Sequence, residues 1–303
     1  MRNFLAVFVL LLLTVGLTPW LVLRDNSQTK IKDGSSVREA LTERAGDEAE
    51  SRVYLLEENK SRSMSLFEFA CGAVAAAMPV EYSDEAISAL SLCVLTYADY
   101  CRARSQPIDC AVLDSSALRE RWGDDYSANL AKIQAAVSRV MGFRLRYDNE
   151  PINAAWHSMS PGRTRAAAKA LELPYLVSVS SDGDRLSPDF CEVKTFSGAQ
   201  LSEALNCEQA EPQLECELSE EGLAESIELF SQKYSAEELY EYLNLRSPFF
   251  TVEEVEDGLQ FKIFGCGEGL GLSCYGADYM ARQGADFCEI VLHYFPDCII
   301  SAE

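Results

Sequence analysis

The chain opens with an uninterrupted uncharged stretch from Phe4 to Leu23. Twenty helical residues span roughly 30 Å, which matches the hydrocarbon core of a bilayer. A cleaved signal peptide has a shorter apolar centre and a small-residue cleavage site, which this stretch lacks. We therefore predict an uncleaved transmembrane anchor over residues 1–23, with a signal peptide as the alternative. The polar composition of residues 24–50 is typical of a juxtamembrane linker.

Beyond residue 50, the hydrophobic pattern changes between helical and extended periods without regular βαβ units. The pair Ser65 and Glu68 predicts a capping box at the start of a helix, which must end before Pro79. Apolar residues at every third or fourth position over residues 87–101 predict a second helix. Further helices are predicted near residues 128–141, 220–231, 236–243, 276–283 and 286–295, and strands over residues 53–56, 143–147, 174–179 and 260–264. We therefore predict one α+β domain over residues 51–303.

The charge of the chain is strongly negative, with 26 Lys and Arg against 48 Asp and Glu, a net charge of −22. Such a surface repels polyanions, so we expect no nucleic-acid partner. The acidic residues concentrate in residues 192–257, which hold 17 acidic and three basic residues. This pattern predicts a solvated acidic region.

The eleven cysteines are scattered, with no Cys-x-x-Cys pair, so they predict no disulfide framework and we expect most to remain thiols. Cys101 and Cys110 are weak candidates for two metal ligands. The chain has two histidines, and no third or fourth ligand is evident, so we predict neither a metal site nor a cofactor.

Two segments have residue types that suit a binding site. Glycines alternate along residues 265–271, which allows the backbone to approach a ligand or another segment closely, although taken alone this pattern favours a structural turn. It matches neither a phosphate-binding loop nor a dinucleotide-binding fingerprint. His157 precedes a segment rich in hydrogen-bonding groups, whereas His293 lies in an apolar helix and is expected to pack there.

Several segments taken together, in order over residues 52–303, resemble the stage II sporulation protein D (SpoIID/LytB) family. They are residues 53–79, 85–98, 147–164, 174–179, 245–250 and 265–296. The resemblance implies an α+β fold with two lobes around a long groove, on the outer face of the cytoplasmic membrane. It also implies work during engulfment as a lytic transglycosylase on peptide-free glycan strands of peptidoglycan. A wall amidase and a membrane scaffold protein are the implied partners.

The chain departs from the family at the position of the catalytic residue. The family's first helix ends in Ala-Glu-Met-Pro, and its glutamate is the acid/base, whereas this chain has Ala77 there. A lytic transglycosylase must protonate the glycosidic oxygen and then accept a proton, which a methyl group cannot do. The family's Gln and Arg of the second helix, its His and Gln near the glycine-rich loop, and its metal-binding cluster are also altered. The residues at these positions are Leu90, Leu95, Glu268, Cys274, Cys101 and Cys110.

Three hypotheses follow from these residues. The first is a catalytically silent protein that binds glycan strands or scaffolds a wall amidase. The second is an active transglycosylase that uses Glu81 or Glu268 as a substitute acid/base. The third, a redox or metal function of the thiols, is the weakest because their spacing is scattered. The predicted substrate-binding residues are His157, Ser158, Ser160, Thr164, Gly267, Gly269 and Gly271.

Overall fold

The computed structural model describes residues 51–57, 60–167, 172–207, 214–219 and 222–302. The predicted anchor and linker, residues 1–50, lie outside these ranges. None of the helices within the described ranges has the length and hydropathy needed to cross a bilayer.

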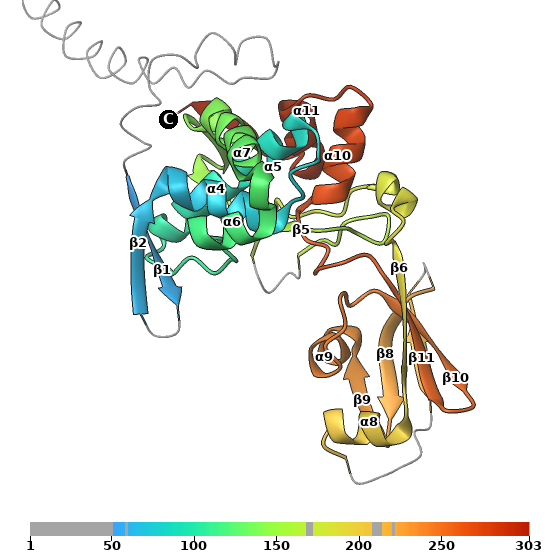
Figure 1. The fold of residues 1–303 in the computed structure, drawn as a ribbon. Helices are drawn as coiled ribbons and strands as arrows, with labels where there is room; N and C mark the ends of the chain where they lie inside the picture. The colour runs from blue at the N-terminus through green and yellow to red at the C-terminus, as the bar shows by residue number, and fades with distance from the viewer. Residues whose placement is uncertain (1–50, 58–59, 168–171, 208–213, 220–221, 303) are drawn as a thin grey trace, which may run out of the picture.

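A helical layer surrounds α5 (Asp84–Ala103). Every residue from Ala86 to Thr96 is buried, so this helix is enclosed on all sides instead of on the one face that its larger apolar residues predict. Its buried hydroxyl groups donate hydrogen bonds to the helix's own carbonyl groups, as Thr96 does to Leu92 O at 2.7 Å. The helices of this layer, seen together in the upper part of Figure 1, are α4 (Leu66–Ala77), α6 (Ser115–Trp122), α7 (Tyr126–Val140), α10 (Cys274–Arg282) and α11 (Phe287–Tyr294).

Short strands border these helices. β1 (Arg52–Glu57) pairs with β2 (Lys60–Ser65) as an antiparallel hairpin. β3 (Phe143–Tyr147) lies between β13 (Ile299–Ala302) and β4 (Glu150–Pro151). β5 (Trp156–His157) and β12 (Leu272–Ser273) form a short parallel pair, which joins two segments more than a hundred residues apart. One apolar core spans the helices and these strands.

A second apolar core lies in the region built from residues 191–264. Its members include Ile227, Leu239 and Phe261, all fully buried. Figure 1 shows this part below the helical layer. Its elements are β6 (Cys191–Phe196), α8 (Gly198–Ala204), β7 (Glu215–Leu218), β8 (Ala224–Leu229), β9 (Gln232–Ser235), α9 (Ala236–Tyr242), β10 (Phe250–Val255) and β11 (Gly258–Phe264). β11 is the central strand of one sheet and β8 of the other.

Most predicted elements are confirmed, but two predictions are wrong. Within the predicted helix at 220–231, residues Ala224–Leu229 instead form the central strand β8, because pairing with β7 and β9 overrides the local helical preference. Residues 174–179 form no strand: isolated hydrogen bonds, such as Ala167 N–H to Leu176 O at 2.9 Å, join them to residues 164–167. The pattern also missed α6, η3 (Asp182–Leu186), β6 and β10.

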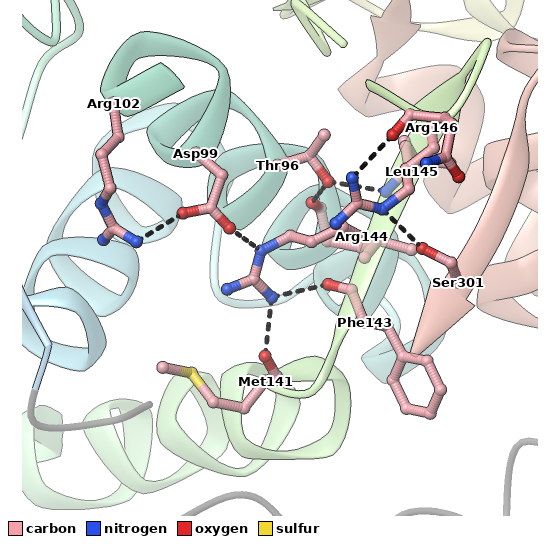
Figure 2. Close-up of polar contacts among 11 residues, drawn as sticks. Thr96, Asp99, Arg102, Met141, Phe143, Arg144, Leu145, Arg146 and Ser301 are labelled. Carbon is pink, nitrogen blue, oxygen red and sulfur yellow. Dashed lines mark hydrogen bonds and ion pairs between the residues drawn. The ribbon is translucent and has the colours of Figure 1, made fainter. Parts of the chain in front are cut away.

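An ion pair between the buried Arg144 of β3 and the half-buried Asp99 joins α5 to β3 (Figure 2). The Arg144 side chain is 1% exposed, and its Nε donates to Asp99. Its Nη1 donates to the carbonyl oxygens of Met141 and Phe143, each at 2.7 Å. Asp99 also pairs with Arg102 at 2.9 Å. The guanidinium group therefore fixes the turn between α7 and β3 against the central helix.

We expect Asp99→Ala to lower the free energy of unfolding by about 3–5 kcal/mol, because it leaves a buried guanidinium without its carboxylate. Glu253→Ala is the matched control, since Glu253 pairs with Lys262 on the surface at 3.0 Å and its loss should cost about 1 kcal/mol or less. Urea denaturation of both variants measures the difference. Equal losses would contradict a structural role for the pair of Arg144 with Asp99.

Candidate functional site

A cleft of about 510 Å³ lies between the helical layer and the second core. The helical layer contributes the end of α4 and Tyr97 of α5 to its wall. Tyr240 of α9, in the region of the second apolar core, and Glu268 of the glycine-rich loop also line it. Segments that are far apart in the sequence thus meet in one concave site, as ligand-binding sites commonly do.

Two alanines at the end of α4 form part of the cleft wall. The capping box starts this helix: Glu68 N–H donates to Ser65 Oγ, and Ser65 N–H donates to Glu68 Oε2, both at 3.2 Å. Pro79 prevents the helix from continuing, so its end is fixed at Ala77. These local signals place the methyl groups of Ala76 and Ala77 in the cleft.

Three aromatic side chains line the cleft: Tyr97, Trp156 and Tyr240. The rings of Tyr97 and Trp156 meet edge to face, with centroids 5.7 Å apart. Burial raises the pKa of Tyr97 and of Tyr240, and the nearby Glu268 raises that of Tyr240 further. Both hydroxyl groups therefore stay protonated near neutral pH and are able to donate hydrogen bonds.

His157 lies in the cleft wall as a neutral imidazole. Its Nδ1 lies 3.0 Å from Leu270 O, and because a carbonyl only accepts, Nδ1 carries the proton. Burial lowers the pKa of His157 to about 4, partly offset by this hydrogen bond. Nε2 is buried and has no hydrogen-bond partner among the described residues. The ring therefore has an unused acceptor at the border of the cleft.

The glycine-rich loop holds His157 closely. Gly267 has φ +95°, and a Cβ there would lie 2.9 Å from the His157 Cβ. At Gly271, with φ +68°, a Cβ would lie 2.1 Å from Ala155 O. Only glycine allows both the left-handed backbone and this approach. Gly267 and Gly271 are thus explained by close contact with residues 155–157, while Gly265 lies against Met159 and Gly269 against the Phe249 ring.

A buried carboxylate, Asp184, connects the segment after β5 to the start of α10. It accepts hydrogen bonds from Ser160 N–H at 2.8 Å, from Ser160 Oγ at 2.6 Å and from Ser273 Oγ at 2.8 Å. Ser273 caps α10. Burial raises the pKa of Asp184, while these hydrogen bonds lower it. Asp184 thereby fixes residues 157–164 relative to α10.

The structure brings together only some of the predicted site residues. Those that line the cleft are Ala77, Cys110, His157, Ser158, Gly267 and Glu268. Ser160 and Thr164 are buried and hydrogen-bonded within the protein, and Gly269 packs against Phe249. The other predicted positions are buried and do not line the cleft: Ser160, Thr164, Gly269, Gly271, Leu90, Leu95, Cys101 and Cys274.

The two candidate substitute acids lie in different places. Glu268 is exposed and belongs to the cleft wall that includes Ala77. Glu81 is exposed in the loop after α4 and does not line the cleft. Sequence reasoning missed Asp109 and Asn153, which line the cleft from irregular segments. It also missed Trp156, although the adjacent His157 was a usable signal.

The described cysteines are all free thiols. Burial raises the pKa of Cys110 to about 12 and also raises that of Cys101, which keeps both protonated near neutral pH, whereas a metal ligand must be a thiolate. Within the described residues, no group of three or more His, Cys, Asp or Glu side chains could hold a metal ion.

His157 should make the fold sensitive to acid. In the unfolded chain the pKa of His157 is near 6.5, so as the pH falls the unfolded chain binds a proton before the folded chain does. The contribution of His157 to stability is therefore complete above pH 6.5 and is lost as the pH falls toward 4. We expect this group to lower the free energy of unfolding by about 2 kcal/mol between pH 7 and pH 5. His157→Asn, whose amide can still donate to Leu270 O, should show a correspondingly shallower pH dependence in urea denaturation.

His293→Gln is the control for that measurement, since it removes the other histidine and should retain the acid sensitivity of the parent. His293 lies on α11, where its Nε2 is 2.7 Å from Ser180 O, and it does not line the cleft. Identical pH profiles for His157→Asn and the parent chain would contradict a neutral, buried His157.

Comparison with known proteins shows two similar chains. Stage II sporulation protein D of Bacillus amyloliquefaciens is 32% identical over 268 residues, an alignment that covers 82% of this chain and 78% of the relative. Stage II sporulation protein D of Bacillus subtilis (strain 168) is 29% identical over 268 residues, with the same coverage. No protein-family model matches the chain. The similarity therefore extends over most of both chains and not over one motif.

Proposed function

This chain belongs to the stage II sporulation protein D family, and we propose that it is a sporulation-associated protein that binds peptidoglycan glycan strands in the cleft without cleaving them. The observation that carries the proposal is the pair of methyl groups, Ala76 and Ala77, in the cleft wall. By family resemblance, position 77 is where a carboxyl would serve as acid and base. General acid–base catalysis contributes about 10²- to 10⁴-fold in rate, so its loss is not easily compensated.

The remaining cleft wall suits the sugar rings of a glycan chain. Tyr97, Trp156 and Tyr240 offer apolar faces, and Asn153 and Ser158 offer hydrogen-bonding groups. Such a mixture of aromatic surface with a few polar groups is typical of small-ligand sites. A glycan without peptides carries hydroxyl and acetamido groups that can pair with these side chains.

The wider setting is part of the proposal. Residues 1–23 anchor the protein in the cell membrane and residues 24–50 link the anchor to the extracytoplasmic domain over residues 51–303. The two apolar cores correspond to two lobes, and the cleft is a portion of a longer groove that faces the cell wall. A wall amidase and a membrane scaffold protein of the engulfment complex are the proposed partners, for which the chain acts as a glycan-binding or scaffolding member.

We expect the full-length chain to bind peptide-free glycan strands and to release no 1,6-anhydromuramic acid ends. Trp156→Ala should weaken strand binding at least about 10-fold, because truncating a central aromatic side chain typically costs 2 kcal/mol or more. Trp122→Ala is the matched control, since Trp122 packs on Tyr126 and does not line the cleft. Co-sedimentation with strands and mass spectrometry of the products give both results. Failure to bind strands would refute the proposal.

Restoring the carboxyl should restore chemistry. We expect Ala77→Glu to release anhydro ends from peptide-free strands at a rate at least about 10²-fold above the parent chain, because the added carboxyl supplies the missing acid and base. Ala77→Gln is the matched control, with the same size and no ionisable group. If Ala77→Glu binds strands and stays inactive, the loss of activity does not rest on position 77 alone.

An active transglycosylase is the second candidate, favoured by the presence of Glu268 in the same cleft wall as Ala77. Against it, Glu268 is exposed, whereas a carboxyl that donates a proton near neutral pH normally lies in an apolar pocket. Anhydro ends produced by the parent chain and lost in Glu268→Gln, but retained in Glu81→Gln, would establish this candidate and exclude catalytic silence.

A further inference from the structure

A second cavity of about 370 Å³ lies next to the cleft along the same chain segment. His157 and Ser158 line the cleft, and a few residues further on Pro161, Gly162 and Arg163 line the second cavity. The hydrogen bonds between Met159 and Cys266, at 3.0 and 2.7 Å, hold the segment between the two sites. The cavity is therefore placed to contact the same extended ligand as the cleft.

Two arginines in this cavity have no carboxylate partner among the described residues. Arg185 makes neither a hydrogen bond nor an ion pair with any of them. Arg163 donates only through Nη1, to Ser178 O and Oγ, both at 3.3 Å. Some arginines of this acidic chain pair with acids, as Arg165 does with Glu237, and others stack on a ring, as Arg119 does on Tyr126. Arg163 and Arg185 do neither among the described residues, and both are exposed, so the cavity holds two guanidinium groups that are accessible to a ligand.

The position of Arg185 is prepared by the backbone around it. Gly162 has φ +108°, a backbone conformation that favours glycine, and the Arg185 side chain lies against its open face, since a Cβ built there would lie 2.1 Å from Arg185 Nε. The preceding residue is the buried Asp184, which is fixed by Ser160 and Ser273. Gly162 O accepts a hydrogen bond from Ser181 N–H at 2.9 Å. These contacts fix the backbone on both sides of the cavity.

The rest of the wall suits a ligand that is only partly polar. The rings of Phe190 and Phe264 lie 5.7 Å apart at the cavity, and Pro161 adds apolar surface. Asp182 also lines it. A planar carboxylate fits the fork of a guanidinium, and a monoanion is repelled less than a phosphate dianion by Asp182 and by a chain of net charge −22.

We propose that this cavity binds a carboxylate carried on a sugar, through Arg163 and Arg185. The inference rests on the proposed function: a glycan strand without peptides carries a free lactyl carboxylate on each muramic acid residue. A protein that holds such strands in the neighbouring cleft gains a means to distinguish them from peptide-bearing strands, in which that carboxylate is an amide. The cavity is then a specificity site for peptide-free glycan.

The test compares N-acetylmuramic acid with its methyl ester, in which a methyl group replaces the negative charge, on the full-length chain in detergent. We expect the acid to bind at least about 10-fold more tightly, as measured by saturation-transfer NMR titration. Arg185→Gln and Arg163→Gln should each abolish the preference. Arg119→Gln is the matched control: Arg119 stacks on Tyr126, away from the cavity, and its variant has the same change in charge.

The possible results separate this proposal from the function of the cleft. Equal binding of acid and ester, or a preference that survives in both arginine variants, would overturn it. Inorganic phosphate that competes as well as N-acetylmuramic acid would overturn the assignment to a carboxylate. Trp156→Ala should keep the preference for the acid. If the parent chain prefers the acid but does not bind strands, the proposed cleft function fails and the carboxylate site stands.

Discussion

The arrangement of both cavities depends on a carboxylate that is withdrawn from water. Asp184 accepts hydrogen bonds from Ser160 and Ser273, two residues that lie more than a hundred positions apart in the chain. Burying a carboxylate is costly unless donors surround it, and here hydroxyl and amide groups do so. Because Ser160 follows β5 and Ser273 is the last residue of β12, Asp184 fixes both the wall of the cleft and the backbone beside Arg185.

This constraint explains why so little of the cleft lies on regular structure. Loops that carry unpaired backbone groups need internal partners, and here the glycine-rich loop and residues 155–165 supply them to each other, for example between Leu272 N–H and Ala155 O at 3.0 Å. The glycines are needed because the two backbones approach too closely for a side chain. Binding groups then project from segments whose backbones are hydrogen-bonded to each other, an arrangement expected to lower the entropy lost on binding.

Local signals in the sequence predicted the helical layer well and the rest less well. The Ser65 capping box and Pro79 determine α4 by chemistry within one or two turns, so its bounds could be predicted. β8 could not, since its extended form depends on two partner strands and not on its own residues. Asp184 lies in an unremarkable polar stretch, and nothing local distinguishes a buried carboxylate from an exposed one. For the site, the sequence and the family resemblance pointed to Ala77, His157 and Glu268, but not to the aromatic walls that come from distant elements.

A cleft wall of aromatic and hydrogen-bonding groups with a methyl group at position 77 fits the proposed binding function better than catalysis. A transglycosylase needs its acid only in the transition state, whereas aromatic and hydrogen-bonding walls contribute to binding in the ground state as well. Under the proposed function, the absence of the acid would remove turnover and leave affinity for the strand. The proposed carboxylate site at Arg163 and Arg185 agrees with a binding role. A protein that presents strands to an enzyme would gain from selecting them by their carboxylates. Among its described residues, the acidic region, residues 192–257, contributes Tyr240 to the cleft and Gly222, Leu223 and Thr251 to the second cavity, all of them uncharged.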